Sequence, residues 1–386
     1  MRDRFKRFNS GRAVLFLVAM IAVFMTGAVL KITADVILSF VIALLLAIAM
    51  SPLIKLLGKL RVPRVVSIVL SGILIIASLI MIGAFFYSSI LAILKAYPRY
   101  ESRITEIYIW LAEFLEFSYN EELSIFENLW AQLGIRNQVR VMTFSLSNGF
   151  VTFIRNAVMV ALFVVFLLFE AVFIKDKLMV AFEGEKAGQI TKMTRDIMSQ
   201  VSRYLSVKFF ISLANGLLIA LFLQFVGLEF AMMWGIIQFF LNFIPVLGSI
   251  TVGVLASLFG IIQFWPQPGP IFLVILIMLG VNIVIGNILD PKIMGDRLGL
   301  APIAVLLPLT IWGFIWGFAG MVIAVPMTVI IKIICENVTV LEPISIILGS
   351  RRSVLAKKLQ YENESIEDAK KMEAEKEKST VDISAK

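Results

Sequence analysis

Polar side chains inside long apolar runs are the residues of this sequence best placed to do chemistry, because each one costs free energy in apolar surroundings. Glu170 lies near the end of the run 156–174, and a carboxylate buried there would have a raised pKa and could exchange a proton or bind a cation. A side chain that simply reaches water is the competing interpretation. Amides lie in the later runs, where they can join helices or line a polar pathway: Asn215, Gln224, Gln238, Asn242, Asn282 and Asn287.

The densest charge cluster among the apolar runs has two acidic and two basic residues: Asp290, Lys292, Asp296 and Arg297. Pro291 follows Asp290 directly, so we expect the preceding helix to end there. Gly295 and Gly299 would permit tight turns. A loop whose charges pair with each other explains this cluster, and a carboxylate that binds a solute, cation or proton explains it equally well.

Signatures of common enzymes are absent from the sequence. It contains no histidine, which removes imidazole proton shuttles, Ser–His triads and histidine-ligated metals. It also contains no G-x-S-x-G, H-E-x-x-H, Walker A or dinucleotide motif. We therefore predict a protein that is not an enzyme and that holds no cofactor and no metal.

Composition identifies the class of protein that must position these residues. Of the 386 residues, 60% are apolar and 16% are charged, and the mean hydropathy is +0.94. Soluble domains are about 25% charged, so this chain has too few polar residues to cover a soluble fold. The single cysteine, Cys335, excludes a disulfide-stapled scaffold. We predict an all-α polytopic integral membrane protein with about eight hydrophobic helical segments.

Runs of about 20 apolar residues are long enough to cross a bilayer. Six simple runs are predicted as spans: 13–30, 36–54, 65–94, 156–174, 204–226 and 270–289. Basic residues dominate the N-terminus and the 55–64 and 175–203 connections, which places both termini in the cytoplasm. The net charge of +8 is spread along these flanks, so we expect no nucleic-acid partner.

Two segments in the C-terminal half are too long for one simple crossing. Residues 229–264 would form a straight helix of about 54 Å, and 301–339 one of about 58 Å. Asn242, Pro245 and Gly248 interrupt the first, and Gly313 and Gly317 lie near the middle of the second. Each segment could cross once, cross twice, or return to its own side as a re-entrant hairpin; we favour the hairpin. Paired interrupted segments are typical of transporter sites, and the two tips should then lie close together.

The predicted organisation has six parts. They are spans 1–3 in 1–94, an external amphipathic helical insertion in 95–155, span 4 in 156–174, a cytoplasmic amphipathic linker helix in 175–203, a transport region with both broken segments in 204–349, and a charged cytoplasmic tail in 350–386. The insertion should contain two helices within 99–134, and residues 186–205 should form a helix lying at the membrane interface.

Together, FFLNFIPVLGSI, NILDPKIMGDRLGLAP, WGFIWGFAG and MVIAVPMTVIIKII resemble the autoinducer-2 exporter (AI-2E) family of bacterial and archaeal permeases. The resemblance covers nearly the whole chain and implies a multi-pass transporter of the prokaryotic cytoplasmic membrane. It also suggests a homo-oligomer, with a pentamer as one candidate. Family members are linked to export of the quorum-sensing signal autoinducer-2 and others to sodium(lithium)/proton antiport. Asp290 stands where the family often has glutamate.

Three functions remain open on the sequence alone. The leading hypothesis is a secondary transporter that exports a small polar solute such as autoinducer-2. The second is a monovalent cation/proton antiporter, and the third is a membrane scaffold or accessory subunit without transport. The candidate pathway comprises Asn215, Gln238, Asn242, Pro245, Gly248, Asn282, Asn287, Asp290, Gly313 and Gly317, and the candidate coupling carboxylates are Glu170 and Asp290. The predicted partners are the lipid bilayer and a small polar solute or monovalent cation.

Overall fold

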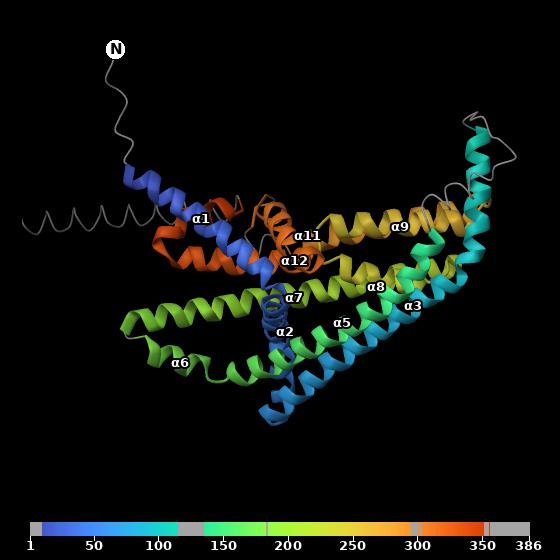
Figure 1. Ribbon diagram of the computed structural model, residues 1–386. Helices are drawn as coiled ribbons and strands as arrows, with labels where there is room; N and C mark the ends of the chain where they lie inside the picture. Colours follow the sequence, from blue (N-terminus) through green and yellow to red (C-terminus); the bar gives the residue numbers. More distant parts are fainter. Residues whose placement is uncertain are drawn as a thin grey trace, which may run out of the picture.

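The computed structural model describes residues 10–114, 135–182, 184–294, 300–301, 303–350 and 355. This part of the chain is helical apart from turns and one isolated bridge between Leu300 and Gly349. Seven of its helices are long and apolar enough to cross a membrane. The protein is therefore a polytopic helical membrane protein, as its composition predicts (Figure 1).

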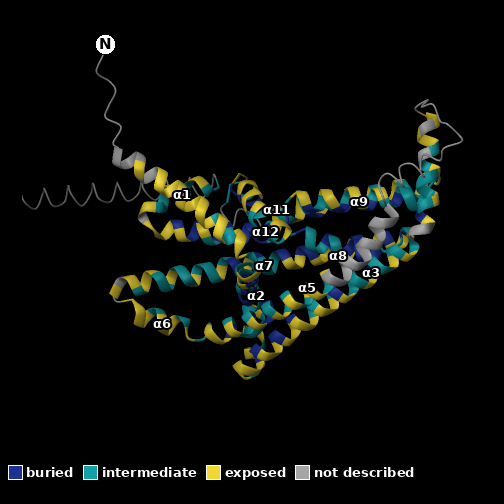
Figure 2. Cartoon of the chain, viewed as in Figure 1, coloured by how far each residue is buried: buried dark blue, intermediate teal, exposed yellow. Residues whose placement is uncertain are grey.

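The described residues of the N-terminal half form long helices: α1 (Ser10–Ile32), α2 (Ala34–Lys59), α3 (Arg64–Phe114) and α5 (Ile135–Glu170). A hydrophobic cluster joins α2, α3 and α5 through residues such as Ala43, Ile68 and Val164. In Figure 1, α3 and α5 run side by side on a long diagonal. Figure 2 shows α1 mostly exposed, as suits a helix facing lipid or another subunit.

The region predicted as an external insertion is built differently from our expectation. Residues 99–114 do not form a separate helix; they are the last part of α3, one helix of 51 residues that turns sharply toward this end (Figure 1). At the other end of the region, residues 135–155 are the first half of α5. Helix-forming residues with no glycine and only Pro98 to interrupt them explain the continuity of α3 across 95–114. The expected second helix, around Trp130, lies outside the described residues.

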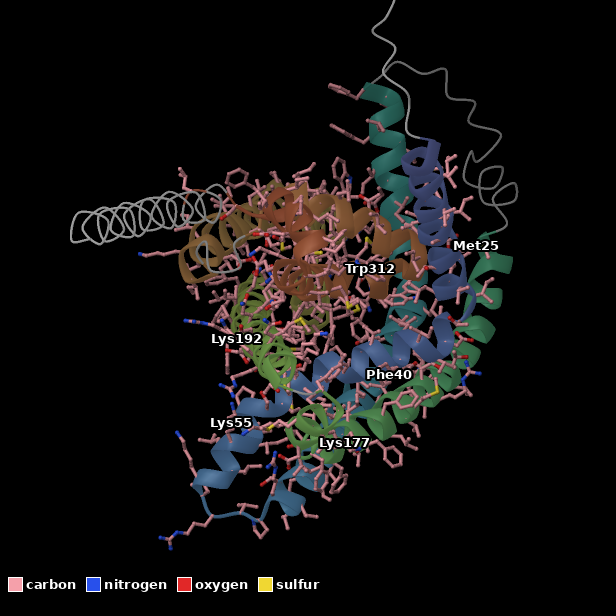
Figure 3. All side chains as sticks on the ribbon, turned by 90° about the vertical axis from the view of Figure 1, so that its left-hand side faces the viewer. Met25, Phe40, Lys55, Lys177, Lys192 and Trp312 are labelled. Carbon is pink, nitrogen blue, oxygen red and sulfur yellow. The ribbon has the colours of Figure 1, made fainter. Side chains whose placement is uncertain are left out.

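The predicted interfacial helix is also continuous with the following span. A short helix, α6 (Ile174–Ala181), leads into α7 (Gly184–Val226), whose 43 residues include the whole of 186–205. Its apolar positions Met193, Ile197 and Val201 pack on other helices, in a cluster with α2 and α12. The spacing thus marks a buried helix face. Figure 3 views the molecule from the end with the α6–α7 turn and labels three lysines: Lys55, Lys177 and Lys192.

The first broken segment is a helical hairpin. It consists of α8 (Ala231–Leu241) and α9 (Leu247–Phe264), separated by a break at Asn242–Val246. A Cβ atom on Gly248 would lie 1.7 Å from the carbonyl oxygen of Leu241, although residues seven apart in one straight helix are separated by about 10 Å along the axis. The chain therefore reverses, and Figure 1 shows α8 and α9 lying alongside each other.

The chain then returns beside α9 as α10 (Pro268–Asn282), which continues as a π-helix, η1 (Ile283–Leu289), and as α11 (Asp290–Met294). Our expectation that the helix ends at Asp290 is wrong. Pro291 is the second residue of α11 and comes directly after the π-helical residues Ile283–Leu289. A change of helix type, rather than a helix end, therefore occurs beside the proline.

The second broken segment, α12 (Ile303–Asn337), also doubles back. Trp316 and Gly317 have non-helical backbone angles, and Gly317 has a φ of +60°. A Cβ on Gly320 would lie 1.9 Å from the carbonyl oxygen of Trp312, whereas a straight helix would separate these residues by about 12 Å. A 3₁₀ turn, η3 (Thr339–Leu341), and α13 (Glu342–Leu348) follow.

The tip of the first hairpin contacts the arms of the second. Ile244, in the first break, packs in one buried cluster with Leu309 and Ala324 from the two arms of α12. The reversal of α12 itself, at Trp316, lies in a different cluster with residues of α2. That the two breaks lie close together therefore stays a prediction. The α8–α9 hairpin is in turn packed on α7 and α10 through buried residues such as Ile219 and Val252.

Candidate functional site

Seven polar residues line the contact between α7, the α8–α9 hairpin and the α10–α11 helix. We call this set the polar seam: Lys208, Ser212, Asn215, Gln238, Asn242, Asn282 and Asp290. Side chains from helices far apart in the sequence meet there, in the middle of otherwise apolar packing.

Helical spacing explains why these side chains face one another. Lys208, Ser212 and Asn215 are separated by four and three residues on α7, so they form one stripe. Phe210, between them in sequence, points away and is 67% exposed, as a lipid-facing side chain would be. Gln238 and Asn242 are four residues apart at the end of α8; Asn242 faces this stripe, and Gln238 faces Asn282 of α10.

Two glycines let the α7 and α8 backbones approach closely enough for the amides to meet. A Cβ on Gly216 would lie 2.5 Å from the carbonyl oxygen of Gly235, and a Cβ on Gly235 would lie 2.5 Å from that of Gly216. Any larger residue at this crossing would push the helices apart.

Amide hydrogen bonds connect the middle of the seam. Asn242 donates to the Ser212 hydroxyl at 2.9 Å, and Asn215 donates to the Asn242 side-chain oxygen at 3.4 Å. Gln238 donates to the Asn282 side-chain oxygen at 2.9 Å, and Asn282 donates to the Ser249 carbonyl at 3.3 Å. These bonds link three helices and the hairpin tip, which is the packing role expected for amides within spans.

A buried ion pair lies at one end of the seam. Lys208 Nζ is 2.7 Å from Asp290 Oδ2, and the two side chains are only 5% and 19% exposed. Asp290 thus pairs with a lysine 82 residues earlier, a contact that neither explanation of the local charge cluster had anticipated. Lys292 is exposed, and Asp296 and Arg297 lie outside the described residues.

Three buried oxygen atoms of the seam have no hydrogen-bond partner within the described part of the chain: Asn215 Oδ1, Gln238 Oε1 and Asp290 Oδ1. A buried polar atom without a partner costs about 1–3 kcal/mol, so such groups in a native protein call for an explanation. All three are acceptors. A hydrogen-bond donor, or a cation, would complete each of them.

The tip of the first hairpin borders the seam and is strained. Val246 has a φ of +64°, a conformation that β-branched residues rarely adopt. Pro245 is half-buried in the turn, and Gly248 is fully enclosed against Leu241. Strained backbone of this kind is concentrated at functional sites.

The glycines of the second hairpin have a turning role. Gly317 supplies the positive φ at the reversal, and a Cβ on Gly313 would lie 2.9 Å from the Met321 side chain on the opposite arm. The indole N–H of Trp316 donates to the Leu30 carbonyl at 2.9 Å, which fixes this tip against α1. These residues shape the region beside the seam without adding polar side chains to it.

Glu170 does not fit the buried carboxylate that we considered. Its side chain is 52% exposed and pairs with Lys177 of α6, at the end of α5. An exposed side chain paired with a lysine fits the simple interfacial interpretation better than a buried carboxylate that exchanges a proton. Gln224 is likewise exposed, and Asn287 lies in η1, where its side chain is outside the described part of the structure.

Lys208 and Ser212 are seam residues that our sequence reasoning missed. A charged residue four positions into the predicted span 204–226 was a usable signal, since charges within spans are rare and usually functional. Its spacing from Asn215 would have extended the stripe to three residues. No group of three His, Cys, Asp or Glu side chains that could hold a metal occurs among the described residues.

Comparison with known proteins agrees with the membrane architecture. A family model described as AI-2E family transporter matches residues 14–339. The chain is 28% identical over 357 residues to "AI-2 transport protein TqsA" of Escherichia coli K12, covering 88% of this chain and 96% of that protein. It is 29% identical over 350 residues to "Putative transport protein YhhT" of the same strain, covering 89% and 96%.

A further relative matches over a shorter stretch. A "Putative transport protein" of Borreliella burgdorferi B31 is 34% identical over 202 residues. That match spans 52% of this chain and 56% of the Borreliella protein, so it supports the relationship without extending it to the full length.

Proposed function

The chain belongs to the AI-2E transporter family, and from this premise we propose that it is a secondary transporter that exports a small polar solute such as autoinducer-2. The polar seam is the proposed solute site. Export requires no nucleotide here, because the sequence has no ATP-binding motif; the energy would come from an ion gradient or from the solute gradient.

One observation carries this proposal: buried acceptors without partners among the described residues line the seam beside the tip of the α8–α9 hairpin. The Asn215 and Gln238 amide oxygens are fully buried and lack donors within the described residues. A solute rich in hydroxyl groups supplies such donors and fits between amides that offer both N–H and C=O groups. The similarity to TqsA, named as an AI-2 transport protein, supports autoinducer-2 as the first solute to test.

The same oxygens favour a second candidate, a monovalent cation/proton antiporter. Amide and carboxylate oxygens such as Asn215 Oδ1 and Asp290 Oδ1 are suitable ligands for a small hard cation. Lys208 argues against simple cation binding beside Asp290, because its ammonium already occupies the other carboxylate oxygen at 2.7 Å. A cation at this end of the seam would have to displace the lysine.

Flux into proteoliposomes of the purified protein distinguishes these functions. We expect uptake of autoinducer-2 into the vesicles that saturates, without sodium–proton exchange under an imposed pH gradient. Sodium–proton exchange without solute flux would favour the antiporter. Flux of neither would favour a scaffold or accessory subunit and reject both transport proposals.

A matched pair of variants connects the flux to the seam. Asn215→Ala and Gln224→Ala each remove one amide from α7, but only Asn215 is buried in the seam, whereas Gln224 is exposed. We expect Asn215→Ala to reduce the flux at least about tenfold, the cost of roughly one buried hydrogen bond, and Gln224→Ala to leave it unchanged. Equal effects would place the pathway elsewhere.

Cytoplasmic-membrane localisation, cytoplasmic termini and assembly into a homo-oligomer remain part of the proposal. The exposed apolar surface of α1, including Val23 and Phe24, provides area that lipid or a second subunit could cover. The absence of enzyme signatures in the sequence supports a protein without catalytic activity.

A further inference from the structure

Three side chains of α3 bind the base of the α8–α9 hairpin, which is the end opposite its tip. Arg99 Nη1 lies 2.7 Å from Glu229 Oε1, and the Tyr100 hydroxyl donates to the second oxygen of the same carboxylate. Arg103 donates to the backbone carbonyl of Trp265 at 2.8 Å. We call this set of contacts the hairpin latch.

The latch holds both arms of the hairpin. Glu229 lies just before α8 and Trp265 just after α9, so one face of α3 contacts the start and the end of the hairpin. Gln263 joins the same two ends: it donates to the Gly227 carbonyl at 2.8 Å and accepts the Glu229 backbone N–H at 2.7 Å. Gln263 therefore ties the two ends of the hairpin together, and α3 contacts both of these ends.

A row of aromatic rings leads from the latch toward the seam. The ring centroids of Tyr100 and Phe259 are 5.2 Å apart, and those of Phe259 and Trp234 are 5.7 Å apart. Trp234 is one helical turn before Gln238 on α8. A displacement of the hairpin base would thus move residues packed directly beside the seam.

The latch joins α3 to a hairpin that is packed mainly on other helices. The buried cluster of α3 is shared with α2 and α5, whereas the hairpin is clustered with α7 and α10 and meets α3 through the partly buried Phe85 and Ile93. We propose that the hairpin latch controls how often the hairpin moves away from α3, and therefore how often the polar seam is accessible. Arg99, Tyr100 and Arg103 are then positioning residues for transport. The inference rests on the proposed function in treating the seam as a solute site.

The chemistry of the latch suits a contact that opens and closes. Arg99 is 70% exposed, and exposed ion pairs of this kind are weak enough to break thermally. Burial, together with the hydrogen bond to Glu229, raises the pKa of the Tyr100 phenol. It therefore remains a protonated donor to the carboxylate at any physiological pH.

Cysteine labelling in lipid nanodiscs tests the latch without needing a substrate. In a Cys335→Ser background, Ser212→Cys places a thiol of nearly the same size in the fully buried centre of the seam. The rate of its reaction with N-ethylmaleimide reports how often the seam opens. Arg99→Ala and Glu229→Gln should each accelerate labelling about two- to fivefold, the range for loss of one exposed ion pair.

Two further variants separate a latch from general loosening. Arg99→Ala combined with Glu229→Gln should label little faster than the faster of the two single variants, because both remove the same contact. Lys177→Gln breaks an exposed ion pair far from the hairpin base and should leave the rate unchanged. Unchanged labelling in the latch variants, or equal acceleration by Lys177→Gln, would overturn the inference.

If a Glu229 variant does not fold, Arg103→Ala provides a separate test, because Arg103 acts through the Trp265 carbonyl. It too should accelerate labelling, and an unchanged rate would count against the latch. Because labelling is independent of solute, latch-dependent labelling without any flux would reject the transporter while retaining the latch.

Discussion

The Lys208–Asp290 pair is the most costly feature of the seam to maintain, because two charges are held among apolar helices. Removing one partner leaves the other charge buried and unpaired, which typically costs about 3–5 kcal/mol. We therefore expect Lys208→Ala to lower the unfolding temperature in detergent strongly. Thermal unfolding followed by size-exclusion chromatography measures this loss.

The double variant Lys208→Met with Asp290→Leu separates stability from function. Replacing a buried ion pair by apolar residues of similar volume is often neutral or stabilising. The double variant should therefore recover most of the stability lost by Lys208→Ala, yet remain inactive in the flux assay if the charges contact the solute or ion. Recovery of both would make the pair structural only.

Individual residues were predictable to different degrees. The amides at 215, 238, 242 and 282 were identified because polar groups stand out in apolar runs, and they do converge. The partner of Asp290 was not identified. A contact across 82 residues depends on which helices become neighbours, and local spacing carries no information about that. The exposure of Glu170 likewise depends on where α5 ends and α6 turns.

At the scale of elements, two glycines determine whether the broken segments can fold back. Gly248→Ala would place a methyl group 1.7 Å from a backbone carbonyl, and Gly320→Ala would place one 1.9 Å from another. A backbone atom cannot move aside as a flexible side chain can, so we expect each variant to lose at least about 1–3 kcal/mol of stability. The yield of monodisperse protein and its thermal unfolding measure the effect.

Gly280→Ala is the matched control for these two variants. It is also a glycine within an apolar helix, but a Cβ there meets nothing within 4 Å. It should therefore be neutral or slightly stabilising, because alanine favours helix more than glycine does. Equal loss in all three variants would show that the hairpin reversals are not the cause.

The positions at which helices break were predictable from the sequence, whereas the continuation of a helix beyond its membrane span was not. Asn, Pro and Gly within 242–248 and glycines within 313–320 marked both reversals correctly. By contrast, the amphipathic patterns at 99–114 and 186–205 indicated separate helices, but both belong to α3 and α7. Periodicity reports which face of a helix is buried and says nothing about whether that helix continues a span.

The described helices form two main packed groups. One group contains α2, α3 and α5, and the other contains α7 to α11 with the seam. The α12 hairpin packs against both α2 and α7, and its arms contact Ile244 at the tip of the first hairpin. In the proposed transporter, a movement of one group against the other would allow a solute at the seam to be approached from either side of the membrane in turn.

Sidedness is the last prediction, and it follows from charge. Basic residues are concentrated in the 55–64 and 175–203 connections, so these should be cytoplasmic. If the α8–α9 hairpin returns to its own side of the membrane, an odd number of crossings then separates α11 from the far end of α3. Leu111 of α3 and Ile293 of α11 are 43% and 44% exposed, which makes them a matched pair for labelling. Single cysteines at these positions are introduced in the Cys335→Ser background.

In intact cells, a membrane-impermeant maleimide should label Leu111→Cys readily and Ile293→Cys only after permeabilisation. Equal exposure in the fold means that a difference in labelling reports the side of the membrane and not the burial of the thiol. Ready labelling of Ile293→Cys in intact cells would move Asp290, and with it the charged end of the seam, to the outer face. Such a result would require the hairpins to cross the bilayer instead of returning to the side from which they enter.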